Sequence, residues 1–219
     1  MALLNRHELN WSMSQAVRHL SSTGDLRRVL SGYLRLMKQR DVALGGSKMT
    51  EKHHRDSLWV TILDNPAIAA AVEYQVSKQS EDAGFVYVLI ESKNLYTVVE
   101  FKNIERPFLN LRTSKTKQTT QDLTNMSLTD ILHLQFHKRD KFQKGTIQKW
   151  VDGDVCDHLR SYVMGQTVQH HSIGKNFRAF AVVIIGSCQI LVREMDHKGE
   201  WKSDWNLVKE PDSTYRCIE

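Results

Sequence analysis

The residues from Tyr74 to Asn103 read YQVSKQSEDAGFVYVLIESKNLYTVVEFKN. Alternating or continuous apolar runs are separated in this stretch by two short polar segments, 80–84 and 92–94. This pattern is typical of strands joined by tight turns. The stretch therefore predicts a three-stranded antiparallel meander, in which the unbroken apolar run 85–90 is covered on both faces.

Further helices and strands are predicted before and after this meander in the sequence. Apolar residues at helical spacing predict helices at about 9–20, 26–37, 50–63, 127–136 and 154–168. In the fourth of these, His133 and His137 would share one helical face. The polar segment 112–121 is expected to be an exposed loop, and two further apolar strands are predicted at 178–186 and 189–195. This order predicts an α/β or α+β sheet with helical cover.

Composition limits the class of protein. The chain has 219 residues, a net charge of +5 and three cysteines, and it lacks an apolar run of the roughly 18 residues that a membrane-spanning helix needs. The N-terminal residues lack the apolar core of a signal peptide. The odd, widely spaced cysteines favour reduced thiols over a disulfide framework. We therefore expect an intracellular protein, cytoplasmic or nuclear, without a membrane contact.

Glu100 and Lys102 lie two residues apart at the end of the third predicted strand. In a strand, alternate side chains share a face, so these two should project together while Phe101 points into the core. A carboxylate beside an ammonium group can hold a divalent cation and orient a water molecule next to a phosphate. As a bare tripeptide, however, Glu-x-Lys on a strand is more often a solvent-exposed ion pair.

The surrounding residues resemble the PD-(D/E)XK nuclease superfamily, most closely the branch found in AAA-ATPase-like and effector-like proteins. In that branch a Gly-led apolar strand, here Gly84–Ile90, precedes a strand that ends in Glu-apolar-Lys, here Tyr96–Lys102. Upstream, Glu51–His54 is similar to the start of the family's first core helix, which often carries a glutamate. Downstream, the segment from His158 to Tyr162 is similar to the family's Gln-x-x-x-Tyr helix.

The resemblance covers roughly residues 50–200 and implies a restriction-endonuclease-like α/β core, with a central mixed β-sheet flanked by helices. On this interpretation residues 1–49 form an N-terminal helical extension and residues 50–219 form the nuclease-like domain. A basic insertion falls at about 108–151.

The resemblance also implies roles for single residues. Glu100 and Lys102 would be catalytic, and Glu100 would bind Mg²⁺ or Mn²⁺. The family's other metal-binding carboxylate falls at Tyr87, whose neutral phenol is a poor ligand for a hard cation. Glu51 and, more weakly, Asp82 are the expected replacements. In the helix motif His158 stands where the family has glutamine, and Tyr162 matches its tyrosine.

The basic insertion points to a polyanion as partner. Residues 101–150 carry ten Lys/Arg against four Asp/Glu. A positively charged insertion beside the Glu-x-Lys strand would lie near the substrate, where phosphate contacts supply affinity. The residues expected to make such contacts are Arg112, Lys115, Lys117, Lys138, Arg139, Lys141 and Lys144. We expect DNA more than RNA, and a merely solvated helical surface remains an alternative of equal weight.

Three functions stay open at this point. We rank first a nuclease-like domain with an impaired metal site, which needs no metal and binds nucleic acid, a protein partner, or both. The alternative is an active Mg²⁺- or Mn²⁺-dependent DNA or RNA endonuclease with a rearranged metal site. A chance resemblance of the meander ranks third.

Overall fold

A computed structural model describes the backbone of residues 4–43, 49–63, 69–77, 83–109, 112–113, 116–117, 120–138 and 141–210. Within these ranges, side chains are described for residues 13–40, 49–63, 88–109, 123–136 and 145–210.

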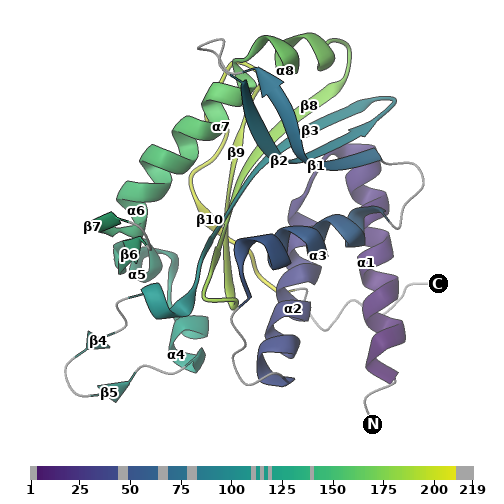
Figure 1. The fold of residues 1–219 in the computed structure, drawn as a ribbon. Coiled ribbons are helices and arrows are strands. Elements are labelled where there is room, and N and C mark those ends of the chain that lie inside the picture. The colour runs from purple at the N-terminus through teal and green to yellow at the C-terminus, as the bar shows by residue number, and fades with distance from the viewer. Residues whose placement is uncertain are drawn as a thin grey trace.

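A six-stranded mixed sheet forms the centre of the molecule, with helices on both faces (Figure 1). The strand order is β1-β2-β3-β8-β9-β10, and the last strand has only two residues. The strands are β1 (Ala69–Ser77), β2 (Ala83–Ser92), β3 (Leu95–Ile104), β8 (Asn176–Ile185), β9 (Gln189–Met195) and β10 (Asn206–Leu207). The chain is therefore an α/β protein, as expected.

The predicted three-stranded meander is confirmed. β1 pairs antiparallel with β2, and β2 pairs antiparallel with β3. β1 begins at Ala69, earlier than predicted, because the pairing with β2 continues as far as Ala69 opposite Glu91. Ladder hydrogen bonds thus override the low strand propensity of the alanines. In β2, Leu89 is buried on one face of the sheet and Val88 and Ile90 on the other, so this part of the apolar run is covered on both sides.

A parallel pair at the middle of the sheet joins the meander to the rest of the chain. β3 and β8 pair from Leu95 opposite Asn176 to Ile104 opposite Ile185. Parallel neighbours need a crossover connection, and here it contains α4 to α8. Both strands therefore end at the same edge of the sheet.

Three N-terminal helices cover one face of the sheet: α1 (Leu4–Thr23), α2 (Arg27–Ala43) and α3 (Glu51–Leu63). Their buried side chains form one cluster with those of β3 and β8, including Leu20, Leu30, Tyr33, Leu58, Ile62, Val99, Phe101, Phe180 and Val182. The two helices expected as an extension thus share a core with the sheet.

The opposite face is covered by the helices of the crossover. α6 (Ile147–Trp150), the π-helical turn η2 (Val151–Val155) and α7 (Cys156–Val163) follow one another without a break, and α8 (Gln166–His171) comes after Gly165. Leu159 and Val163 of α7 pack in a second cluster with Val98 of β3 and Ala181 of β8. The prediction of a single helix over 154–168 was therefore wrong, because a turn at Met164 and Gly165 ends α7.

The insertion is more structured than its sequence predicted. Its elements are η1 (Arg106–Phe108), β4 (Arg112–Thr113), β5 (Thr116–Lys117), α4 (Thr120–Asn125), α5 (Leu128–His133), β6 (Gln135–Lys138) and β7 (Lys141–Thr146). Thus the expected loop at 112–121 contains a short hairpin. The helix predicted over 127–136 stops at His133, because Gln135 pairs with Thr146 across the β6–β7 hairpin. His137 lies in β6, so it does not share a helical face with His133. No helix of the described residues is long and apolar enough to cross a membrane.

Candidate functional site

Glu100 and Lys102 point from β3 toward α7. Phe101, between them, belongs to the cluster under α3 on the other face of the sheet. On the α7 side, His158 reaches the same carboxylate. The alternation expected of the Glu-x-Lys tripeptide is therefore present.

The three polar groups form a short series from the interior to the surface. Lys102 Nζ lies 3.1 Å and His158 Nδ1 lies 3.5 Å from Oε1 of Glu100. The exposed fractions of the side chains are 0% for Glu100, 15% for Lys102 and 53% for His158. A ligand coming from solvent would meet the imidazole first and the carboxylate last.

Neither carboxylate oxygen of Glu100 is hydrogen-bonded, although both are buried. The distance to Lys102 satisfies an ion pair, but the geometry is not that of a hydrogen bond. A buried acceptor left without a hydrogen bond costs about 1–3 kcal/mol, and more when it is charged. Such groups are rare in folded proteins and call for an explanation, such as a catalytic role or an ion.

Glu51 approaches β3 from the opposite layer. Its Oε2 accepts a hydrogen bond of 3.2 Å from the backbone N–H of Asn103, and the side-chain amide of Asn103 donates to the carbonyl of Met49 at 3.1 Å. These bonds tie the start of α3 to the end of β3. Glu51 therefore makes a contact between α3 and β3.

In comparisons with known proteins, the chain matches no family model, no curated protein and no solved structure. The site has to be judged on its own chemistry. Mg²⁺ prefers several oxygen ligands in octahedral geometry. Within the described residues, no group of three or more His, Cys, Asp or Glu side chains is placed to hold a metal ion. Among the described side chains, Glu100 supplies one carboxylate to this site, and Lys102 pairs with it.

Several predicted site residues lie outside the described residues. Asp82 is one of them, and the backbone of Tyr87 lies in β2 but its side chain is not described. The side chains of the seven basic residues of the insertion, which we expected to contact phosphates, are not described either. Tyr162 is described, and it is buried in α7 one turn after His158, where it belongs to the hydrophobic cluster.

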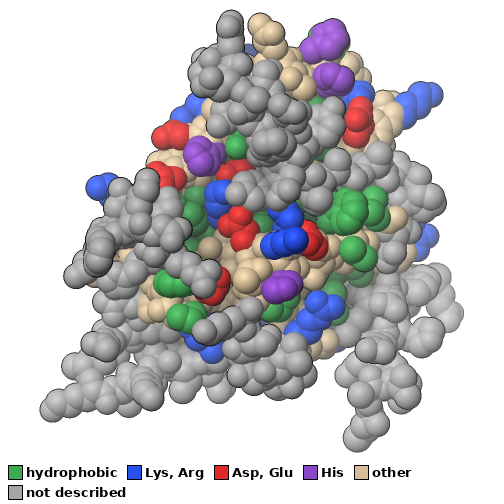
Figure 2. Space-filling view, in the orientation of Figure 1, with side chains coloured by type: hydrophobic (Ala, Val, Ile, Leu, Met, Phe, Trp, Pro, Cys, Tyr) green, Lys and Arg blue, Asp and Glu red, His purple; other side chains and the backbone are tan. Residues whose placement is uncertain are grey.

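The surroundings of the site carry mixed charge. Figure 2 shows acidic and basic side chains close together in the middle of one face, in the region between α7 and α3 where β3 passes. Histidines lie on both sides of this group. The middle of the face shown in Figure 2 is thus polar.

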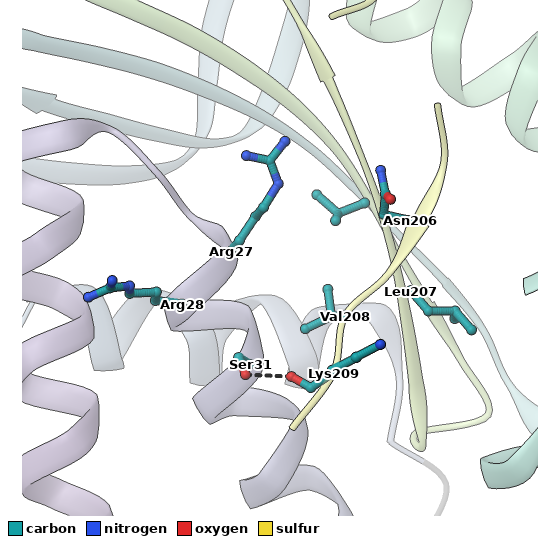
Figure 3. Close-up of a pocket in the computed structure, with 8 residues that line it drawn as sticks. Arg27, Arg28, Ser31, Asn206, Leu207, Val208 and Lys209 are labelled. Atoms are coloured by element: carbon teal, nitrogen blue, oxygen red, sulfur yellow. Dashed lines mark hydrogen bonds between the residues drawn. The ribbon is translucent and has the colours of Figure 1, made fainter. Parts of the chain in front are cut away.

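A separate hollow of about 540 Å³ lies between α2 and the β9–β10 edge (Figure 3). Arg27, Arg28 and Lys209 line it, but the side chains of Arg28 and Lys209 point away from each other. Arg27 already contacts Glu194 and Asp25. The cations therefore do not converge on one ligand, and we do not regard this hollow as the functional site.

A hydroxyl–imidazole–hydroxyl series links α2, α3 and the β8–β9 turn. His54 Nδ1 lies 3.0 Å from the hydroxyl of Tyr33, and its Nε2 lies 3.1 Å from Oγ of Ser187. Burial, and then the nearby cations His53 and Arg40, lower the pKa of His54 to about 4. An imidazole with such a pKa is a weak base at neutral pH. Because it is also fully buried, this series is a structural link and not a catalytic relay.

Sequence reasoning did not foresee the contact between His158 and Glu100. The resemblance placed His158 at the glutamine position of the helix motif, but it gave no distance to the strand. The signal was present in the apolar residues around it: Val155, Leu159 and Val163 define the face of α7 that packs on the sheet. The position of that face along β3 depends on tertiary packing, which one sequence does not specify.

Proposed function

We propose that this chain is a nuclease-like α/β domain that binds nucleic acid and has little or no cleavage activity of its own. The order of its elements supports this function. A helix (α3), an antiparallel meander (β1–β3), a helical crossover that includes α7 and a parallel strand (β8) follow one another. This is the order implied by the resemblance to the PD-(D/E)XK superfamily, and the Glu-x-Lys lies in the second half of the third strand.

The observation that carries the proposal is the position of Glu100, Lys102 and His158 together on the α7 face of β3. Lys102 offsets the charge of Glu100, so the described side chains of the site do not supply the excess of negative charge that holds a divalent cation for hydrolysis. A lysine and an exposed histidine next to a basic insertion would instead favour a phosphate backbone.

Salt dependence of binding tests the nucleic-acid part of the proposal. Fluorescence anisotropy would measure the affinity of the full chain for short single- and double-stranded DNA and for RNA over a range of salt. Each phosphate contact contributes roughly 0.9 to the slope of log affinity against log salt on duplex DNA. If four insertion lysines make such contacts, replacing Lys115, Lys117, Lys138 and Lys141 by Gln should lower that slope by roughly three to four.

A matched control uses Lys198→Gln and Lys209→Gln, since both lysines are exposed and lie outside the insertion. These changes should leave the slope nearly unaltered. Absence of binding at low salt, or an affinity that does not change with salt, would refute nucleic-acid binding and favour a protein partner.

Cleavage assays test the second part of the proposal, that the chain has little or no nuclease activity. We expect no cleavage by the wild type with Mg²⁺ or Mn²⁺, because a phenol at position 87 removes one carboxylate from a site that has few. Tyr87→Asp should introduce measurable cleavage, and adding Lys102→Ala to it should abolish that activity. Robust cleavage by the wild type that is lost in Lys102→Ala would show an active endonuclease with rearranged ligands.

A further inference from the structure

Arg106 presents two unpaired hydrogen-bond donors at the edge of the sheet where β3 and β8 end. It is the first residue of η1, shortly after the end of β3. Its Nε and Nη2 atoms are buried and have no hydrogen-bond partner, although the residue as a whole is partly exposed. Among the described residues, no carboxylate forms an ion pair with it. Buried charged donors without a partner are costly and call for an explanation.

The two unpaired atoms are those that form the side-on fork of an arginine. The Nε–H bond and one Nη2–H bond are parallel, and they match the two oxygens of one carboxylate or phosphate group. Arg178 shows this fork in use, because its Nε and Nη2 donate to the two oxygens of Glu194 at 2.8 and 2.7 Å. Arg106 therefore offers the same pair of donors that holds a carboxylate elsewhere in this protein.

The surroundings of Arg106 strengthen an interaction with an anion. A methyl group on Gly186, the first residue after β8, would lie 3.8 Å from Cβ of Arg106, 3.5 Å from Cδ1 of Leu109 and 2.6 Å from Cδ2 of Leu123. Both leucines are buried, and charges attract each other more strongly beside apolar groups than in water. The carboxyl ends of parallel strands, here β3 and β8, are also where open α/β sheets bind ligands.

We infer that Arg106 binds the carboxylate of an acidic ligand, which is a small carboxylic acid or an acidic side chain of a partner protein. One carboxylate neutralises the guanidinium, whereas a phosphate monoester would bring excess negative charge beside the leucines. A backbone phosphate of nucleic acid has sugars on both sides, but a carboxylate projects from the end of a molecule and can enter a narrow place. Since neither Nε nor Nη2 is bonded, the fork can turn toward such a ligand without breaking a contact.

The experiment follows the arginine Nε–H signals of the isotope-labelled full chain by NMR while sodium acetate replaces sodium chloride at constant ionic strength. The Arg106 signal, identified by its loss in Arg106→Lys, should shift and approach a limit. The Arg178 signal should stay in place, because this group is already bonded to Glu194. A blocked tripeptide whose only charge is a glutamate side chain is the second ligand. Tighter binding of the peptide would identify a protein partner as the source, and tighter binding of acetate would identify a small acid.

Stability separates a binding role of Arg106 from a structural one. In chloride, Arg106→Met should unfold at the same urea concentration as the wild type or a higher one, because the change removes buried donors that lack partners. Acetate at ten times its dissociation constant should raise the urea midpoint of the wild type by roughly 0.5–1 M. It should do the same for the control Arg28→Gln, at an exposed arginine beside the hollow under α2, but not for Arg106→Met.

Three results would overturn the inference. The first is an Arg106 signal that neither acetate nor the peptide moves. The second is a larger shift of this signal with inorganic phosphate than with acetate. The third is an Arg106→Met variant that unfolds in chloride at a clearly lower urea concentration than the wild type, which would show a structural role. None of these results bears on nucleic-acid binding, which the salt titration decides separately.

Discussion

At the scale of single residues, two buried carboxylates of the sheet have opposite surroundings. Glu194 of β9 receives two hydrogen bonds from Arg178, at 2.8 and 2.7 Å, and further contacts from Arg27 at 2.9 Å and Lys202 at 3.1 Å. The carboxylate oxygens of Glu100 accept no hydrogen bond, although Lys102 and His158 lie within ion-pair distance of one of them. A satisfied buried carboxylate stabilises the fold, whereas an unsatisfied one adds a cost that a ligand can offset.

The pairing of Glu194 leads to a stability prediction. Burial alone would raise its pKa, but the hydrogen bonds and charges of Arg178 and Lys202 outweigh burial and lower the pKa to about 2. Glu194→Gln would remove the carboxylate to which Arg178 and Lys202 donate, and the one ion pair left to Arg178 among the described residues would be its longer contact of 4.0 Å with Asp25. Removing one partner of a buried ion pair costs on the order of 3–5 kcal/mol, and urea unfolding at neutral pH should show a loss of this size. Glu200→Gln, at an exposed carboxylate close by, should change the free energy of unfolding by less than about 0.5 kcal/mol.

At the scale of elements, His54 of α3 connects α2 to the turn between β8 and β9. Its ring joins Tyr33 of α2 to Ser187 of the β8–β9 turn. Ser187 is the one non-glycine residue with a positive φ, 60°, among the described residues, and Gly186 before it has a φ of 57°. Two such residues make the tight turn that favours a hairpin. The imidazole thus holds the end of the hairpin against α2 and α3.

The low pKa of His54 predicts a loss of stability in mild acid. In the unfolded chain this histidine takes up a proton below its ordinary pKa of 6.5, whereas in the folded chain it does so only near pH 4. The unfolded state therefore binds more protons between these values, and stability falls as the pH drops from about 6.5 to 4. Each pKa unit is worth ~1.4 kcal/mol, so the full effect is up to roughly 3 kcal/mol.

Urea unfolding at a series of pH values would measure this window. This pH window lies above the window in which Glu194 affects stability, which extends from its ordinary pKa of 4.5 down to about 2. A His54→Gln variant should lose the slope between pH 6.5 and 4, while His197→Gln should keep it. Equal slopes in the wild type and a folded His54→Gln variant would contradict the assignment.

Local patterns predicted the parts of the fold that depend on local chemistry. The meander followed from alternation and polar turns, and the capping box of α5, in which Ser127 and Asp130 bond each other reciprocally, could be recognised from the sequence. The end of α5 could not be predicted, because Phe136 pairs in a hairpin whose partner strand lies further along the chain. The Glu-x-Lys pair was predictable on β3, but the contact with His158 needed the packing of α7 on the sheet.

At the scale of the whole molecule, the parallel pair in the middle of the sheet joins two distant parts of the chain. Residue 95 lies opposite residue 176, 81 positions later, and every other pair of β3 and β8 has the same separation. Both hydrophobic clusters contain residues from each of these strands. Neither layer of helices can therefore complete its core until β8 is in place.

This separation has a consequence for synthesis on the ribosome. Elongation at about 5–20 residues per second leaves roughly 4–16 s between the emergence of β3 and that of its partner. During that interval the nascent meander exposes an apolar strand edge, the kind of surface on which chains aggregate. The chain thus cannot reach its native state until its last third has been synthesised. An mRNA truncated before β8 would encode an insoluble product, which chaperones must hold or proteases remove.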